Sequence, residues 1–197
     1  NWDEEYNVTP LRKYTSVELF AGGGGLAIGM EKAGFHHILL NEFDKAACNT
    51  LRTNRPNWNV LEGDIHNVSF KEYEGKVDFL SGGFPCQAFS LAGQRLGFDD
   101  NYKGMCRGTL FMEVARLCEY HKPKVIFCEN VKGLVIHDRG GTFKIICKTF
   151  EDLGYKVFYK VLNSKNFGVP QNRERIYVVA FRNDIAPETF EFPEMTD

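Results

Sequence analysis

The sequence predicts an α/β protein with a mostly parallel seven-stranded sheet in which the last strand runs antiparallel. Short apolar segments alternate with segments of helical periodicity, which is the pattern of repeated βαβ units. One apolar segment, 124–128, is continuously hydrophobic, as expected for a strand covered on both faces. The last two apolar segments are joined by residues that fit no helix, so we expect them to pair as a hairpin.

The first unit of this fold is a strand over 15–20, a glycine-rich turn over 21–25 and a helix over 26–33. The spacing of apolar residues predicts the helix, and Gly34 ends it. Consecutive glycines let a ligand lie against the backbone and against the N-terminus of the helix. The segment therefore predicts a nucleotide-binding turn.

The second strand, 36–42, ends in an acidic residue, Glu42, which lies twenty residues after Gly22. A carboxylate at this distance from a glycine-rich turn can accept hydrogen bonds from both hydroxyls of a ribose. The alternative is a solvated glutamate at a strand end, but the spacing favours the ribose role. This spacing suits a nicotinamide cofactor and S-adenosylmethionine equally, so it does not choose between them.

A helix over 45–54 leads to a third strand at 59–62, which is followed by Gly63 and Asp64. A carboxylate just past a strand end can accept a hydrogen bond from an adenine amino group. Gly-Asp turns are common, so Asp64 alone would carry little weight. Together with the glycine-rich turn and Glu42, it completes a candidate adenosine site.

The fourth strand, 76–81, leads into the run Gly-Gly-Phe-Pro-Cys, which ends at Cys86. The glycines permit a tight turn, and the proline fixes its own φ angle. We therefore expect the cysteine at a rigid corner past the carboxyl end of a strand, where open α/β sheets bind ligands. A free cysteine is usually a buried, inert thiol, but this corner favours a nucleophile.

The following segment, 87–108, is rich in glycine and polar residues and is longer than a plain connection, so we expect a lid or a binding loop. An amphipathic helix is predicted next, over 109–121. The strand at 124–128 is followed by another acid at a carboxyl edge, Glu129. The remaining elements are one helix and two strands, at 141–153, 155–162 and 175–181.

Composition limits the class of protein. The chain has 197 residues, 43% of them hydrophobic and 25% charged, which is ordinary for one soluble globular domain. No apolar run approaches the ~20 residues of a membrane span, and the N-terminus does not resemble a signal peptide, so no membrane partner is expected. The six cysteines form no Cys-x-x-Cys pair and have no close histidine at zinc-ligand spacing, so no metal site is predicted. Because no export signal is recognised, we expect a reduced compartment.

Charge is unevenly distributed along the chain, although the net charge is only −2. Residues 91–175 contain 15 Lys and Arg against 9 Asp and Glu, whereas the segments on either side are acidic. The positive excess thus follows Cys86, as expected if that side of the protein meets phosphate groups. Charged helix faces are often merely solvated, so this observation is weak when taken alone.

Four short motifs follow one another along the chain. They are Phe20-Ala21-Gly22-x-Gly24-Gly25, Gly83-Phe84-Pro85-Cys86-Gln87, Glu129-Asn130-Val131 and Gln171-x-Arg173-x-Arg175. In this order they resemble the motifs of the DNA (cytosine-5) methyltransferases, and the resemblance runs from about Thr15 to Asn183. It implies a Rossmann-like fold of the S-adenosylmethionine-dependent methyltransferases. A nicotinamide oxidoreductase is set aside, because it leaves Pro85, Cys86 and Glu129 without a role.

The resemblance also implies a mechanism. The thiolate of Cys86 attacks carbon 6 of a cytosine in DNA, carbon 5 then takes the methyl group of S-adenosylmethionine, and loss of the carbon-5 proton expels the cysteine. Glu129 is implied to bind ring nitrogen 3 and the amino group, and Arg175 to bind the exocyclic oxygen. Arg173 is implied to support the base, the loop or the phosphates. The target base would be flipped out of the duplex and covered by the 87–108 loop.

Two sets of binding residues follow from the adenosine site and the resemblance together. The expected cofactor-binding residues are Phe20, Ala21, Gly22, Gly24, Gly25, Leu26, Glu42, Phe43, Asp64, Ile65 and Pro85. The expected substrate-binding residues are Gln87, Ser90, Asn130 and Gln171.

The sequence departs from the family at its C-terminal end. We expect a lead-in over 1–14, a catalytic domain over 15–183 and an acidic linker over 184–197. In the family, a target-recognition domain and a final segment of the cofactor site come after this point. The sequence therefore indicates either a truncated polypeptide or one subunit of a split enzyme, whose second chain supplies the rest.

Two alternatives to DNA methylation stay open at this stage. The substrate can be transfer RNA, because some relatives act on it and the motifs do not distinguish the two. The chain can also be a cofactor-binding subunit that is inactive without its partner. The expected location is the cytoplasm for a bacterial protein and the nucleus for a eukaryotic one.

Overall fold

The computed structural model describes residues 13–84 and 110–195. Their strands form a seven-stranded sheet in the order β3-β2-β1-β4-β5-β7-β6. β7 runs antiparallel to both β5 and β6, and the other neighbours are parallel, which confirms the predicted fold class. The strands are β1 (Tyr14–Leu19), β2 (Phe35–Glu42), β3 (Val60–Glu62), β4 (Phe79–Gly82), β5 (Val125–Val131), β6 (Tyr155–Asn163) and β7 (Glu174–Arg182).

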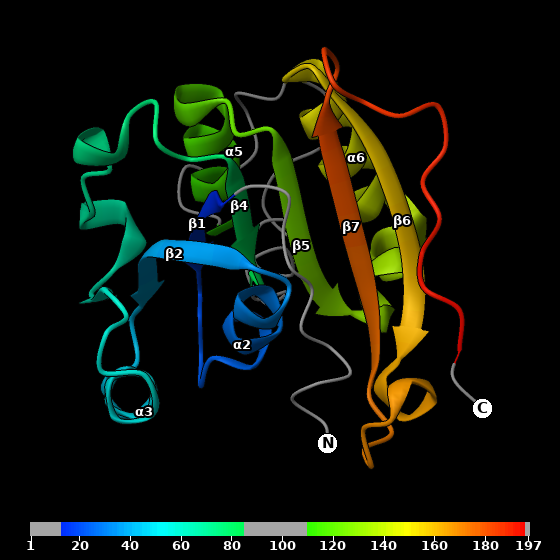
Figure 1. Cartoon of the computed structure of the whole chain (residues 1–197). Coiled ribbons are helices and arrows are strands. Elements are labelled where there is room, and N and C mark those ends of the chain that lie inside the picture. Colours follow the sequence, from blue (N-terminus) through cyan, green and yellow to red (C-terminus); the bar gives the residue numbers. More distant parts are fainter. Residues whose placement is uncertain (1–12, 85–109, 196–197) are drawn as a thin grey trace.

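Helices cover both faces of the sheet (Figure 1). They are α2 (Gly25–Lys32), α3 (Lys45–Asn54), α5 (Leu110–His121) and α6 (Gly141–Asp152). The larger core lies under α5 and α6, where Phe111, Phe143 and Phe150 pack with the apolar side chains of β1, β4 and β5. A smaller core on the other face joins Ala27 of α2, Leu40 of β2 and Leu51 of α3. β1 and β4 are therefore buried on both faces. Burial alternates along β5, so the prediction that this strand is covered on both faces was wrong.

Most predicted bounds agree with the structure within one or two residues, and α3 has the bounds predicted for it. The main differences lie in β4, which begins at Phe79 instead of residue 76, and in β5, which continues to Val131 instead of ending at Cys128. The extra residues pair with β7, Glu129 with Tyr177 and Asn130 with Ile176. Glu129 and Asn130 are thus strand residues, because the antiparallel partner extends the ladder beyond the apolar run that predicted the strand.

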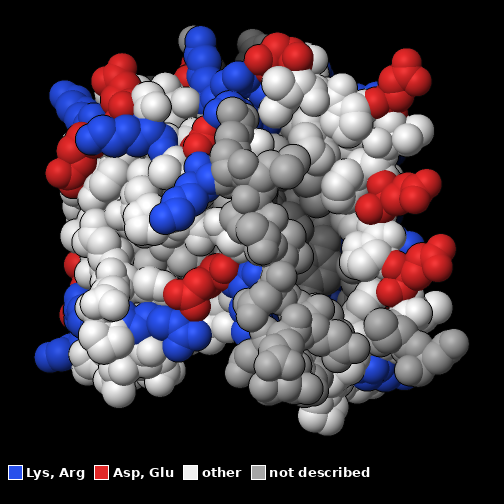
Figure 2. All heavy atoms as spheres, viewed as in Figure 1, with Lys and Arg blue, Asp and Glu red and all other residues white. Residues whose placement is uncertain are grey.

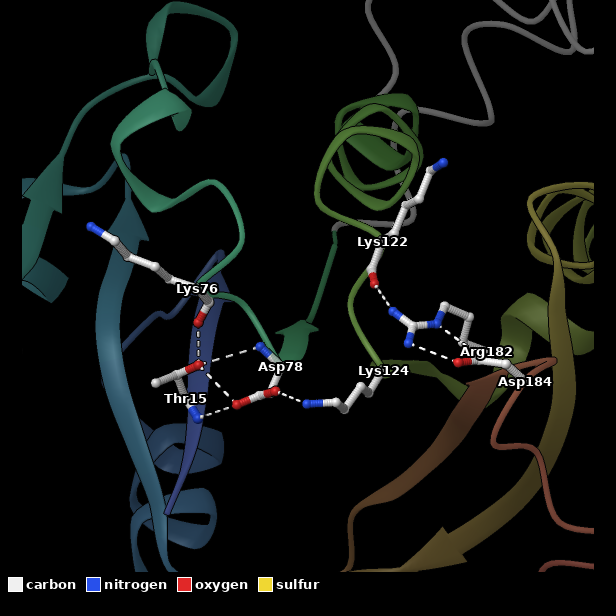
Figure 3. Close-up of polar contacts among 7 residues, drawn as sticks. All are labelled: Thr15, Lys76, Asp78, Lys122, Lys124, Arg182 and Asp184. Atoms are coloured by element: carbon white, nitrogen blue, oxygen red, sulfur yellow. Dashed lines mark hydrogen bonds and ion pairs between the residues drawn. The ribbon is translucent and has the colours of Figure 1, made fainter. Parts of the chain in front are cut away.

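A polar network closes the sheet at the amino ends of its parallel strands (Figure 3). The Asp78 carboxylate accepts hydrogen bonds from the backbone N–H and the hydroxyl of Thr15, both at 3.2 Å, and forms an ion pair with Lys124. Burial raises the pKa of Asp78, but the hydrogen bonds from Lys124 and Thr15 outweigh this effect and the pKa is lowered. Arg182, at the end of β7, donates to the carbonyl of Lys122, at 2.6 Å, and makes a two-pronged ion pair with Asp184, at 2.6 and 2.9 Å. The network therefore fixes β1, β4, β5 and β7 at the edge opposite the candidate site.

The expected acidic linker is packed against the sheet as far as it is described. The Phe190 ring lies 5.8 Å from the Phe158 ring and 5.4 Å from the Phe181 ring, and Lys156 donates to the carbonyls of Pro187 and Glu188. Figure 2 shows acidic side chains down the right-hand side, where this segment runs in Figure 1. Its aromatic residues, which the acidic composition obscured, hold it in place.

β1 carries a buried acid, Glu18, whose side chain lies on the α2 face and is 1% exposed. Its carboxyl group accepts hydrogen bonds from the Ser81 hydroxyl, at 3.4 Å, and from the backbone N–H of Ala27. Burial raises the pKa of Glu18 from 4.5 to about 8, because these two bonds do not make up for the lost water. Glu18 thus links β1 to β4 and to the first turn of α2.

We expect the free energy of unfolding to fall as the pH rises from 4.5 to about 8, because the folded protein retains a proton on Glu18 that the unfolded chain releases. Between about pH 6 and pH 7.5 the expected loss from Glu18 is about 2 kcal/mol. Urea unfolding of Glu18→Gln at the two pH values should lack this loss. The exposed control Glu119→Gln should retain it, and equal pH slopes in both variants would contradict the assignment.

No helix in the parts of the chain that the structure describes is long and apolar enough to span a membrane.

Candidate active site

A pocket of about 490 Å³ opens where the parallel strands end, at the edge of the sheet opposite the Asp78 network. Five predicted cofactor-binding residues line it, namely Phe20, Glu42, Phe43, Asp64 and Ile65. Its walls also contain five residues that the sequence analysis did not assign to the cofactor, which are Asn41, Gly63, His66, Gly83 and Leu110. Glu42 and Asp64 of the candidate adenosine site therefore share one cavity, whereas the glycine-rich turn over 21–25 is not among the residues that line it.

Glu42 is the last residue of β2, and its carboxylate accepts hydrogen bonds from three backbone N–H groups. One carboxylate oxygen, Oε2, accepts from the N–H of Gly22 at 2.7 Å. The other, Oε1, accepts from the N–H groups of Phe43 and Asp44, each at 2.8 Å. The structure thus brings Glu42 to the glycine-rich turn, as the spacing predicted, and fixes the direction of its carboxylate.

The other glycine-turn residues shape the pocket without lining it. Gly24 has a φ of 89° and is the N-cap of α2, and a Cβ atom there would lie only 2.7 Å from Leu51 of α3. Ala21 belongs to the small core and donates its N–H to the carbonyl of Asn41 at 3.1 Å. Gly25 and Leu26 begin α2. These residues therefore set the path of the turn by packing against their neighbours.

Asn41 fixes the opposite wall of the pocket. Its buried side-chain amide donates to the carbonyls of Leu61, at 3.0 Å, and Gly63, at 3.1 Å. Asp64 follows directly and begins a short 3₁₀ turn, Ile65–Asn67, in which Ile65 is buried. Two consecutive residues, Asn41 and Glu42, thus hold both the glycine-rich turn and the turn that carries Asp64.

Glu129 and two arginines meet at the same edge of the sheet. Oε1 of Glu129 lies 3.0 Å from Nε of Arg175 and 3.4 Å from Nη2 of Arg173. A Cβ atom on Gly83 would lie 3.2 Å from the other oxygen, Oε2, so a glycine at this position leaves room for the carboxylate. Gly83 also lines the pocket, which places the Glu129 cluster beside the candidate adenosine site.

Two predicted substrate-binding residues have structural contacts. Asn130 is buried, and its amide donates to the carbonyl of Phe84 at 2.8 Å while its Oδ1 accepts from the N–H of Val131 at 2.8 Å. Gln171 lies in the exposed turn before β7, where its carbonyl accepts from the Ser164 hydroxyl at 2.7 Å. Asn130 therefore anchors the chain at the end of the fourth strand's glycine run.

Several predicted residues lie outside the described residues. They are Pro85, Cys86, Gln87 and Ser90, together with the expected lid at 87–108. Phe84, which Asn130 holds, is the last described residue before them.

Comparison with known proteins identifies the family. Residues 14–196 match the family model of the C-5 cytosine-specific DNA methylases. The chain belongs to this family. It is 56% identical over 186 residues to Type II methyltransferase M.PspPI of Psychrobacter and 52% identical over 186 residues to Type II methyltransferase M.Eco47II of Escherichia coli. Each match covers 94% of this chain but only 44% and 43% of the relatives, so the chain spans less than half of their length.

A solved structure has the same fold. Spodoptera frugiperda DNMT2 aligns with 92% of this chain and 54% of its own length, with a TM-score of 0.72 and 22% sequence identity. At this identity the likeness concerns the fold alone. The four motifs predicted a C-5 cytosine-specific DNA methylase, and the comparisons confirm both this family and its fold.

Some pocket residues of this methylase were not predicted from the sequence, and they differ in whether the sequence contained a signal for them. Asn41 directly precedes Glu42 and follows an apolar run, so the sequence alone suggested a buried amide at the end of this strand. The sequence contained no signal for His66, whose ring is at the pocket through a hydrogen bond to Asp64 within one turn. Leu110 reaches the pocket from α5, and such a contact is set by tertiary packing.

Proposed function

We propose that the protein transfers a methyl group from S-adenosylmethionine to carbon 5 of cytosine in DNA, with Cys86 as a covalent nucleophile. The observation that supports this best is that the candidate adenosine pocket and the Glu129–Arg175 pair share one edge of the sheet. Gly83 belongs to both, since it lines the pocket and faces Oε2 of Glu129. A methyl donor in the pocket would thus lie close to a base held by Glu129.

The pocket residues fit an adenosine group. Three backbone N–H groups fix the direction of the Glu42 carboxylate and leave an acceptor position on Oε2 for a ribose hydroxyl, and Asp64 presents a carboxylate for an amino group. Phe43 is 74% exposed beside them, and such a large apolar surface favours contact with a ligand ring. When bound, S-adenosylmethionine supplies a methyl group on a positively charged sulfur.

Replacing Glu42 with alanine is expected to weaken S-adenosylmethionine binding by about 1–3 kcal/mol, the range for lost hydrogen bonds to a charged group. Isothermal titration measures this change directly. Glu62→Ala is a matched control, because Glu62 pairs with Glu42 across β3 and β2 but bonds to Arg52 at 2.8 Å. An unchanged dissociation constant for Glu42→Ala would show that Glu42 does not bind the ribose and is only a solvated glutamate at the end of a strand.

In the proposed reaction, carbon 5 of cytosine is a poor nucleophile until its ring is activated. Addition of the Cys86 thiolate to carbon 6 forms a C–S bond, breaks the aromatic ring system and moves electron density to carbon 5. Carbon 5 would then form a bond to the methyl group while the bond between that methyl group and the sulfonium sulfur breaks, and S-adenosylhomocysteine would leave. Loss of the carbon-5 proton to a base and breakage of the C–S bond restore the aromatic ring and free Cys86.

Glu129 would bind ring nitrogen 3 and the amino group and stabilise the ring as charge develops there. Arg175, 3.0 Å from Glu129, would bind the exocyclic oxygen. Arg173 makes the longer contact, 3.4 Å, and its more exposed side chain suits a role toward the base, the loop or a phosphate. These contacts require an unstacked base, so we include flipping of the target cytosine in the proposal.

A methyl-transfer assay tests the proposal and separates its two nucleic-acid substrates. The protein is incubated with radiolabelled S-adenosylmethionine and either duplex DNA or transfer RNA, and the labelled nucleoside is identified. Label in 5-methylcytosine of DNA is the expected result. Label in transfer RNA alone, or on the exocyclic nitrogen of cytosine, would overturn it. The second chain foreseen from the sequence stays a prediction, and adding a candidate partner to the same assay would test it.

A further inference from the structure

His66 makes two hydrogen bonds with Asp64 at the edge of the pocket. Oδ1 of Asp64 accepts two hydrogen bonds from the same residue, from the backbone N–H of His66 at 3.0 Å and from the ring nitrogen Nδ1 at 2.6 Å. The side chain of Asp64 is 43% exposed and that of His66 is 36% exposed, and both residues line the pocket. Within residues 13–84 and 110–195, no hydrogen bond reaches the other oxygen, Oδ2.

The chemistry of this pair fixes which atom donates. Hydrogen bonds from the backbone and then the ring of His66 lower the pKa of Asp64, so its carboxylate is ionised at neutral pH. An ionised carboxylate only accepts, and Nδ1 must therefore carry the proton in the 2.6 Å contact. Oδ1 is thus occupied twice, and Oδ2 remains as the acceptor available to a ligand.

The backbone around Asp64 is fixed on both sides. The carbonyl of Gly63 is held by Asn41 at 3.1 Å, and the Asp64 carbonyl accepts from the N–H of Asn67 at 2.9 Å. Ile65, between Asp64 and His66, is buried in the larger core. The remaining freedom of Asp64 is rotation of its side chain, and the contact with the His66 ring restricts this rotation.

We propose that His66 is a positioning residue that holds Oδ1 of Asp64, presents Oδ2 to the ligand, and so makes the pocket selective for a purine with a 6-amino group over one with a 6-oxo group. An amino group donates to Oδ2, whereas a 6-oxo group places a second acceptor against it. Sites that present a fixed hydrogen-bonding group reject ligands that cannot pair with it. The inference rests on the proposed cofactor, whose adenine carries such an amino group.

Two substitutions separate the effect of the Nδ1–H donor of His66 from the effect of the size of its ring. His66→Asn places an amide N–H where Nδ1 lies and removes the ring, whereas His66→Phe keeps a ring without a donor. Titration calorimetry of each protein with S-adenosylhomocysteine and with its 6-oxo analogue S-inosylhomocysteine gives a ratio of dissociation constants. In the parent protein and in His66→Asn, we expect the 6-amino ligand to bind about tenfold more tightly than the 6-oxo ligand. In His66→Phe, we expect the two dissociation constants to lie within about threefold of each other. Matching unfolding midpoints establish that the variants are folded.

The possible outcomes distinguish this inference from the proposed function. A tenfold preference retained in His66→Phe would overturn the positioning role and leave the cofactor assignment intact. A parent protein that binds both ligands equally would remove the role of Asp64 and therefore that of His66. A parent protein that binds neither ligand would refute the proposed cofactor, and the inference with it.

Discussion

Replacement of Cys86 by serine is expected to reduce methyl transfer by at least about 10⁴-fold while leaving S-adenosylhomocysteine binding nearly unchanged. The reason is chemical, because a serine hydroxyl is a much weaker nucleophile than a thiolate at neutral pH and cannot add to carbon 6 of cytosine at a comparable rate. Single-turnover methyl transfer to duplex DNA measures the first quantity, and titration calorimetry measures the second. A Cys86→Ser rate within tenfold of the parent would refute the covalent mechanism.

The thiols in the described part of the chain support this choice of nucleophile. Burial raises the pKa of Cys128 to about 12 and that of Cys147 to about 11, and it also raises the pKa values of Cys48 and Cys118. These four groups therefore stay protonated at neutral pH and are poor nucleophiles. Of the two other cysteines in the sequence, Cys86 follows the Gly-Gly-Phe-Pro run.

Cys147→Ser is the matched control, because it makes the same chemical change at a half-buried thiol of α6. It should retain methyl transfer at nearly the parental rate. A second measurement uses duplex DNA that contains 5-fluorocytosine, since fluorine prevents the loss of a proton from carbon 5. A covalent protein–DNA complex should accumulate with the parent protein and with Cys147→Ser, but not with Cys86→Ser.

The sequence was sufficient for the sheet and for the meeting of Glu42 with the glycine-rich turn, because both depend on local patterns. Alternating apolar segments predicted all seven strands, and a spacing of twenty residues brought Glu42 to Gly22 at 2.7 Å. Each of these features follows from strand ends that share one edge of a parallel sheet. The position of Glu129 at the same edge follows from the same rule.

Features that depend on tertiary packing were not predictable in this way. β5 extends to Val131 because β7 pairs with it, and no local pattern in its last residues announces that pairing. Gly24 is required by the approach of Leu51, although its run of glycines pointed to ligand contact alone. The aromatic contacts of Phe190 with Phe158 and Phe181 hold a segment for which the sequence analysis, based on its acidic composition, expected only a linker.

Glu129→Gln is expected to lower the rate of methyl transfer by about 10²–10⁴-fold, the range for loss of a positioned acid or base. The amide keeps the size of the side chain but carries no charge for Arg175 and cannot transfer a proton to ring nitrogen 3. Single-turnover rates on duplex DNA report this loss. The dissociation constant for S-adenosylhomocysteine should change little, because Glu129 is not among the residues that line the pocket.

Glu174→Gln provides the control for Glu129→Gln. Glu174 lies between Arg173 and Arg175 in the sequence, but its carboxylate pairs with Lys132, at 2.9 Å, and its side chain is nearly half exposed. Removing this charge alters the same edge of the sheet without changing Oε1 of Glu129 or its contacts with the two arginines. Methyl transfer should stay within about threefold of the parental rate, as expected for an exposed ion pair. If both variants lose activity equally, the effect belongs to the charge of this edge, and Glu129 has no special role toward the base.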